Sequence, residues 1–159
     1  MAREIVKRAL NFRQLGWPIA IALGAGILPA AALEPHDLRY LQGTGQCVEC
    51  HLQDAILVRA PLMGARLMGS DLSRSDLSRA SLIAADLFGA NLTEVTLVGA
   101  NLVGADLSYA KLNEADLSGA ILYDVIWNGT QTEGAFYTEE TVFDPEVDPE
   151  SLGMILLEE

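Results

Sequence analysis

The side chains best suited to bind a cofactor or to react lie together in Cys47-Val48-Glu49-Cys50-His51. C-x-x-C-H is the attachment signature of c-type haem, in which both thiols bind the porphyrin and the histidine ligates the iron. His51 would then be the proximal ligand. A methionine would be the distal ligand, with three candidates: Met63, Met68 and Met154. The same two thiols could instead form a disulfide, or take part in other redox or metal chemistry.

A leucine repeat must position these groups. Residues 50–129 divide into sixteen quintets without an insertion, and the central residue is leucine in fifteen of them and Trp127 in the last. Two positions before the centre stands Ala in eleven quintets, Ser or Val in two each, and Cys50 in the first. A period of five fits neither a helix nor a simple strand. It predicts a solenoid, in which each repeat buries its apolar side against its neighbours.

The A-(D/N)-L-x-x pattern resembles the pentapeptide-repeat family over about half of the chain. The resemblance implies an all-β fold, a right-handed quadrilateral β-helix with four quintets to a coil and about four coils. The leucine and the small residue would point inward. The Asp or Asn before the leucine suits a turn, because its side chain bonds to nearby backbone. The expected core includes the following residues: Cys47, Cys50, Leu52, Leu57, Leu72, Leu92, Leu112 and Trp127.

The repeat register also bears on the cysteine motif. Cys50 falls in the small inward slot, Cys47 in the central slot one quintet earlier, and His51 where other quintets have Asp or Asn. Exported cyanobacterial members of the family resemble this layout, with a short helix followed by C-x-x-C-(D/N)-L. Core thiols or a disulfide are therefore favoured, and no cofactor or metal is expected. Haem or thiol redox chemistry remains the alternative.

Residues 1–32 are typical of a signal peptide. Basic residues precede an apolar run from Leu15 to Leu28, and small residues up to Ala32 suit cleavage there. An uncleaved membrane anchor is the alternative. Both interpretations place the repeats outside the cytoplasm, in a periplasm or thylakoid lumen. After cleavage no stable membrane insertion is expected.

Residues 33–49 are expected to form an N-terminal helical cap, and residues 130–159 a C-terminal tail with a capping helix. That last helix would begin at Asp148-Pro149, an N-cap followed by proline at the first position, with Met154 to Leu156 as its apolar side. Such caps would cover the open strand edges at the ends of a solenoid.

The net charge of −12 excludes ordinary nucleic-acid binding, because DNA and RNA are themselves negative. An acidic DNA mimic, like the cytoplasmic topoisomerase-binding members of the family, is a less favoured alternative. Those members typically have Phe at many central positions and lack a signal peptide, whereas this chain has Leu and an export segment.

Outward positions twenty residues apart should stack on one face of the coil. One such column is apolar in all four coils and its neighbour in the first two, and these residues form a candidate partner surface: Met63, Ile83, Val103, Tyr123, Met68 and Phe88. The alternatives are that the tail covers them or that β-branched residues merely favour strands.

No catalytic constellation is present in the sequence. We therefore expect a non-enzymatic protein that binds an unknown protein partner as a scaffold or assembly factor, and a homodimer is another outcome.

Overall fold

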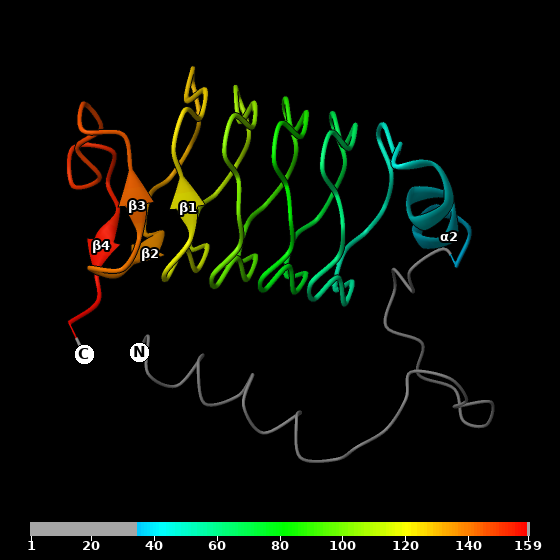
Figure 1. Ribbon diagram of the computed structural model, residues 1–159, viewed down its shortest axis with the longest axis horizontal. Helices are drawn as coiled ribbons and strands as arrows, with labels where there is room; N and C mark the ends of the chain where they lie inside the picture. Colours follow the sequence, from blue (N-terminus) through cyan, green and yellow to red (C-terminus); the bar gives the residue numbers. More distant parts are fainter. Residues whose placement is uncertain (1–34, 159) are drawn as a thin grey trace, which may run out of the picture. The chain divides into compact units, whose positions relative to one another are not determined.

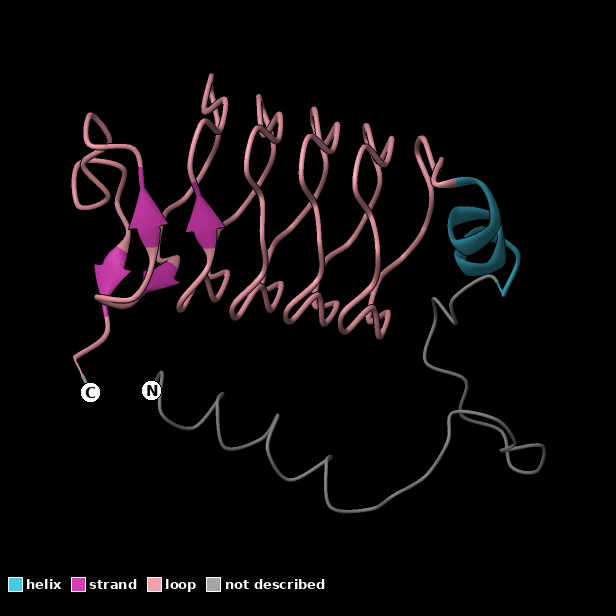
Figure 2. Ribbon diagram, viewed as in Figure 1, coloured by secondary structure: helices cyan, strands magenta, loops and turns pink. Residues whose placement is uncertain are grey.

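The computed structural model describes residues 35–158, so the predicted signal peptide, residues 1–32, lies outside the described residues. In this part of the chain the helix α2 (Pro35–Thr44) comes first, and a long series of turns and single bridges follows it (Figure 1). Four short strands complete the fold (Figure 2): β1 (Ile121–Leu122), β2 (Phe136–Tyr137), β3 (Val142–Phe143) and β4 (Ile155–Leu156).

The backbone pairs with itself at a fixed interval. Parallel bridges join residues twenty positions apart, from Gln46–Arg66 to Asp116–Phe136. Each coil therefore has twenty residues, and the paired stretch amounts to about four and a half coils. This stretch begins before residue 50 and continues beyond residue 129, because Cys47 and Thr132 occupy the buried central position in quintets that lack a central leucine. The Thr132 hydroxyl is satisfied by donating to the Leu152 carbonyl, 2.5 Å away.

A turn after every central residue makes the coil four-sided. In most quintets the N–H three residues after the centre donates to the carbonyl of the central residue, as from Ala55 to Leu52 at 3.2 Å. The last residue of each quintet has a positive φ, and in ten quintets that residue is not glycine and has φ between 53° and 59°. Between layers, the Leu72 N–H donates to the Asn91 carbonyl at 2.8 Å. Turns and ladders thus satisfy the backbone without long strands.

Aspartate and asparagine have the turn role that the sequence predicts. In seven quintets the side-chain Oδ1 accepts the N–H two residues further on, at 2.9–3.3 Å. Asp71 is the most heavily bonded of these residues. Burial raises its pKa, but hydrogen bonds from Ser73, Gln53 and Asn91 outweigh that effect, so the pKa lies below its usual value.

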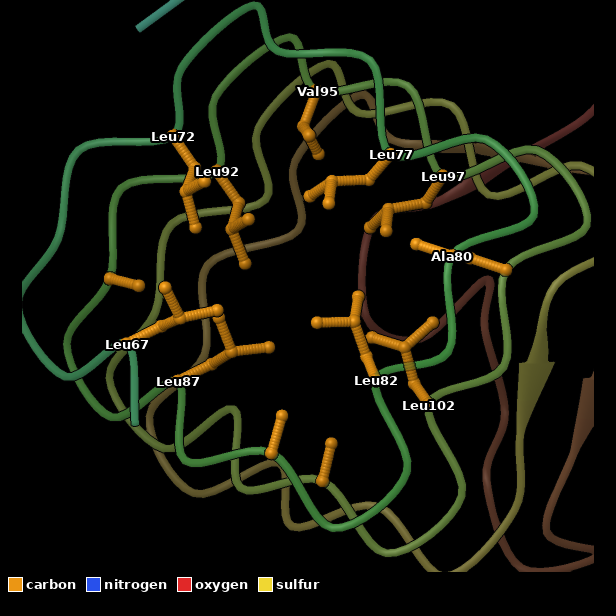
Figure 3. Packing of buried hydrophobic residues seen from close by; sticks show 14 of the residues in the cluster. Leu67, Leu72, Leu77, Ala80, Leu82, Leu87, Leu92, Val95, Leu97 and Leu102 are labelled. Atoms are coloured by element: carbon orange, nitrogen blue, oxygen red, sulfur yellow. The ribbon is translucent and has the colours of Figure 1, made fainter. Parts of the chain in front are cut away.

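The leucines fill the axis of the coil (Figure 3). Leu52, Leu57, Leu72, Leu92 and Leu112 are each at most 3% exposed. The small residues at the preceding slot are buried beside them, because only a short side chain leaves room for the leucine of the same quintet. Full burial of one leucine stabilises a fold by about 1.5–3 kcal/mol, so this column is the main source of stability.

Helix α2 lies across the first coil (Figure 1). Leu41, 1% exposed, belongs to the same hydrophobic cluster as the leucine column, and Leu38 packs against that cluster. The helix ends where the Gly45 N–H donates to the Leu41 carbonyl at 2.8 Å, and Gly45 has φ +67°. Among residues 35–158, no helix has the length and apolar character needed to span a membrane.

The predicted C-terminal capping helix is wrong. The Asp148 Oδ1 does accept the N–H groups of Glu150 and Ser151, at 3.2 and 3.4 Å, so the N-cap signal produces a turn. That turn stops at Gly153, which has φ +79°. The chain then extends as β4, and the Ile155 N–H donates to the Ala135 carbonyl at 2.8 Å. Pairing with an existing layer satisfies more of the backbone than a short isolated helix would.

An aromatic cluster closes the C-terminal end of the core. Trp127 is half-buried, and its ring centroid lies 6.4 Å from that of Phe143. Tyr137 packs edge-on against Phe143, with centroids 5.7 Å apart. β1 pairs with β3 at an offset of 21 residues, and β2 with β4 at an offset of 19. Both offsets differ by one residue from the twenty-residue interval of the other coils, and both occur in the layers that contain the bulkier aromatic rings.

Candidate functional site

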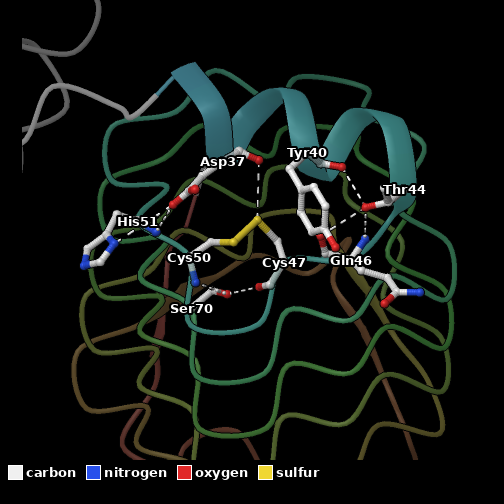
Figure 4. Close-up of a disulfide and its surroundings, with 8 residues drawn as sticks. All are labelled: Asp37, Tyr40, Thr44, Gln46, Cys47, Cys50, His51 and Ser70. Carbon is white, nitrogen blue, oxygen red and sulfur yellow. Dashed lines mark hydrogen bonds and ion pairs between the residues drawn. A yellow bond between two sulfur atoms is a disulfide. The ribbon is translucent and has the colours of Figure 1, made fainter.

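The two cysteines form a disulfide at the first coil, with their sulfurs 2.09 Å apart (Figure 4). Cys47 is 0% exposed and points into the core, whereas Cys50 is half-buried. The motif begins where α2 ends, so the helix and the first turn of the coil position the two sulfurs together.

Ser70, one coil further on, holds the disulfide turn. In most other quintets the N–H three residues after the central residue donates directly to the carbonyl of that residue. Here the Ser70 hydroxyl lies between the two groups. It donates to the Cys47 carbonyl, and it accepts the Cys50 N–H at 3.2 Å. Ser70 is 0% exposed, so these bonds replace water that cannot reach the turn.

Asp37 connects α2 to the same turn. Its Oδ2 accepts the His51 backbone N–H at 3.0 Å, and its carbonyl oxygen lies 3.4 Å from the Cys47 sulfur. The sulfur has no proton to donate in the disulfide, so that contact is van der Waals. The His51 ring, whose side chain is 77% exposed, lies 4.0 Å from the same carboxylate (Figure 4).

These groups do not fit a c-type haem. Both sulfurs and the imidazole would have to face one porphyrin, but Cys47 points into the core and His51 points to solvent. The disulfide form also has no thiol left for a thioether bond. Of the three methionines proposed as the distal ligand, Met154, 5% exposed, is ruled out by its place in the last layer of the solenoid. Among residues 35–158, no three His, Cys, Asp or Glu side chains come together as a metal site.

The predicted partner surface lies on two adjacent faces, and we call it the apolar corner: Met63, Ile83, Val103, Tyr123, Met68 and Phe88. Met63 is 70% exposed, Tyr123 53% and Phe88 41%. The other three side chains are half-buried. Residues 130–158 therefore do not cover the corner, although the sequence left that alternative open.

Tyr109 extends this surface, and the sequence reasoning missed it. Its side chain is 61% exposed and meets Phe88 edge-on, with centroids 5.3 Å apart. Tyr109 is a turn residue, two positions after Leu107, whereas the predicted columns contain only the residues that directly follow a central residue. The sequence does contain a sign that Tyr109 has room at the surface, because the positions twenty residues before and after it are Gly89 and Gly129. A Cβ at Gly129 would lie 2.8 Å from the Tyr109 ring, so the glycine leaves room for it.

Charge is sparse around the apolar corner. The turn positions beside it include Gly64, Ala84, Gly104, Gly69 and Gly89. Asp124 is the one charged turn residue beside the corner within residues 50–129, whereas six of the eight turn residues on the other two faces are charged. Arg74 there makes a bidentate ion pair with Asp54, with both N–O distances at 2.9 Å. The corner is thus the least polar side of the coil.

Comparison with known proteins agrees with this architecture. The family model described as pentapeptide repeats matches eight copies, over residues 46–82 and 85–122. A solved pentapeptide repeat protein from Nostoc Pcc 7120 is 33% identical, over 76% of this chain and 91% of that protein, with a TM-score of 0.47. No curated protein matches this chain.

Two further solved structures are similar at lower identity. A pentapeptide repeat protein from the cyanobacterium Cyanothece 51142 is 28% identical, over 69% of this chain and 98% of that one, with a TM-score of 0.35. One from the Arabidopsis thaliana thylakoid lumen is 28% identical, over 69% and 75%, with a TM-score of 0.40. The repeat match and the identity to the Nostoc protein establish that this chain belongs to the pentapeptide-repeat family, whose fold is a right-handed quadrilateral β-helix.

Proposed function

We propose that this is a non-enzymatic, exported protein that presents the apolar corner to a protein partner, as a scaffold or assembly factor. The observation that carries the proposal is the exposure of Met63, Tyr123 and Phe88, at 70%, 53% and 41%, on two adjacent faces of the solenoid and in three of its coils. Contiguous exposed apolar side chains of this kind are typical of interaction sites. Aromatic residues and methionine are also enriched at the centres of protein interfaces.

The backbone beneath the corner favours this role. The Gly64 N–H donates to the Ile83 carbonyl at 2.8 Å, and the equivalent bonds of Ala84 and Gly104 follow in the next two layers. The side chains above them are therefore held in fixed columns before a partner arrives. A pre-organised surface loses less conformational entropy on binding, which increases affinity without additional contacts.

Export is supported by three observations. The sequence starts with a segment typical of a signal peptide, a relative is a thylakoid lumen protein, and the Cys47–Cys50 disulfide suits an oxidising compartment. A periplasm or thylakoid lumen is the proposed location. Edman sequencing of the protein from its native host should begin at Leu33, whereas an intact Met1 in a soluble cytoplasmic fraction would contradict export.

Charge argues against nucleic acid as the partner. Residues 35–158 contain six lysines and arginines against nineteen aspartates and glutamates, a net charge of −13. Such a surface repels phosphates. DNA mimicry would use that negative surface and would leave the apolar corner without a role, so it stays the less favoured alternative.

Two charge-matched double variants test the corner. Met63→Asp with Tyr123→Asp places two carboxylates on it, in the first and fourth coils. Gln53→Asp with Asn113→Asp places the same two charges in the same coils and the same slot, but on the opposite face. All four side chains are exposed or half-buried, so both variants should fold. Gln53→Asp also replaces the hydrogen bond to Asp71 by a contact between two carboxylates, so the fold of this control is checked by circular dichroism as well.

Each protein would be cross-linked in extract of the exported compartment, and the partners identified by mass spectrometry. The wild type and the opposite-face variant should capture the same partner, which the corner variant should lose by at least tenfold at unchanged far-UV circular dichroism. Equal capture by both variants would contradict the role of the corner.

Thiol redox chemistry is a second candidate, favoured by the disulfide and by the partial exposure of Cys50. A thiolate of a partner could reach the Cys50 sulfur, releasing the Cys47 thiolate into the core. A measured potential above about −200 mV would support a redox role, whereas one below about −300 mV is typical of a structural disulfide.

An absorption spectrum of the native protein without a Soret band would exclude the haem alternative.

A further inference from the structure

β4 forms the last layer of the coil and is paired along only one edge. The N–H groups of Ile155 and Leu157 donate to Ala135 and Tyr137 carbonyls, both at 2.8 Å, which directs them towards β2. Alternate backbone groups of a strand point in opposite directions. The Leu156 N–H and carbonyl therefore point away from β2, and no layer follows them among residues 35–158. This edge could pair with one more strand.

The side chains of this edge are apolar and exposed. Ile155 is 47% exposed, Leu156 37% and Leu157 39%. The other end of the solenoid differs, since α2 covers it and Leu41 is 1% exposed. An uncovered strand edge with apolar side chains is a template for strand addition.

Carboxylates close to β4 decide what can bind at this end of the solenoid. Between residues 131 and 158 there are eight aspartates and glutamates and no lysine or arginine. A Glu133 carboxylate oxygen lies 2.8 Å from where a Cβ of Gly153 would be, just before β4. Burial and the charges of Glu150 and Asp148 raise the pKa of Tyr137 in the paired strand, which places those carboxylates nearby. A second copy would bring the same carboxylates face to face, so self-pairing is opposed.

We propose that the free edge of β4 binds an extended segment of another protein in which lysine or arginine alternates with apolar residues. The segment would pair its backbone with Leu156, place its apolar side chains on Ile155 and Leu157, and direct its cations to Asp148 and Glu150. The carboxylates thus prevent end-to-end association of this protein and select a basic partner.

Binding of a labelled Lys-Val-Lys-Val-Lys-Val peptide to the full-length protein, measured by fluorescence anisotropy, tests this proposal. Leu156→Pro removes the outward N–H, and Leu156→Ala is the matched control that keeps it while also shortening the side chain. Proline is tolerated where a strand N–H faces solvent, so β4 should persist in both variants. Leu156→Pro should bind the peptide at least about fivefold more weakly than Leu156→Ala, the effect of one lost backbone hydrogen bond.

Two further peptides separate the contributions. A Glu-Val-Glu-Val-Glu-Val peptide should not bind, and the basic peptide should bind more weakly at physiological than at low ionic strength. A basic peptide with alternate N-methylated amides cannot pair and should lose affinity even if Leu156→Pro disturbs the end of the chain. Equal binding of the methylated and unmethylated peptides would overturn strand addition. Concentration-dependent dimerisation of the wild type that Leu156→Pro abolishes would overturn the choice of a basic partner.

Discussion

The turn column that contains Ala84 and Gly104 tests how the backbone sets stability. These residues occupy the same corner in successive coils, with φ of 53° and 68°. A residue with a Cβ loses about 1–2 kcal/mol in this left-handed conformation, whereas glycine adopts it readily. We therefore expect Ala84→Gly to stabilise the protein and Gly104→Ala to destabilise it.

The two changes should be similar in size and opposite in sign. A Cβ at Gly104 would meet no heavy atom within 4 Å, so no steric clash adds to the cost of the backbone conformation. Alanine also restricts the unfolded chain, which offsets about 0.4–1 kcal/mol of that cost. The net change in the free energy of unfolding is then about 0.5–1 kcal/mol in each direction, or about 1–4 °C in Tm for a protein of this size.

Guanidinium unfolding followed by far-UV circular dichroism measures both changes. The double variant, which exchanges the two residues and keeps the composition, should return close to the stability of the wild type. Gly129→Ala is a contrasting control, because its Cβ would lie 2.8 Å from the Tyr109 ring and should cost more. If Ala84→Gly and Gly104→Ala shift the midpoint in the same direction, the φ angle does not control stability at this corner.

Three further predictions concern the first two coils. Ser70→Ala should cost about 1–3 kcal/mol in guanidinium unfolding, because it leaves the Cys47 carbonyl and the Cys50 N–H buried and unpaired, whereas Ser75→Ala should change little because its turn keeps the backbone bond. The lowered pKa of Asp71 means that its charged form contributes stability above about pH 4, and this contribution is lost as the pH falls through the lowered pKa. Asp71→Asn should therefore be less stable than the wild type at neutral pH, and the difference should shrink in acid titrations. Reduction of the Cys47–Cys50 disulfide should lower the free energy of unfolding by about 2 kcal/mol, since the closed loop is short, and unfolding with and without a phosphine reductant measures this.

The repeat made most of the fold predictable. A fixed period of five allows one arrangement in which every leucine is buried, so the sequence also places Cys47 in the core and His51 outside it. The sequence could not choose between free thiols and a disulfide, because that depends on how close the first turn brings the two sulfurs. It also could not show that Ser70, one of two serines in the small slot, holds that turn.

The C-terminal end was less predictable, since tertiary pairing there outweighs local signals. Asp148 and Pro149 are good helix-starting residues, and they do form a turn. Whether that turn continues depends on β2, whose free carbonyls are available only once the solenoid has formed. Tyr109 was missed for a related reason, because its exposure depends on the space left by Gly129 one coil away.

The acidic residues are concentrated in the C-terminal part of the sequence, and in a solenoid this concentrates negative charge at one end of the molecule. Position in the sequence equals position along the axis of a solenoid, and from residue 112 to residue 158 there are eleven acidic residues and no basic one. The described end with the free edge is therefore the negative end. Joining two such ends is opposed by charge, and joining one to the opposite end of another copy is opposed by α2, which covers that end. A basic strand from a different protein is neither repelled by the charge nor blocked by α2. The uneven distribution of charge can therefore prevent polymerisation and still leave the β4 edge open to a partner.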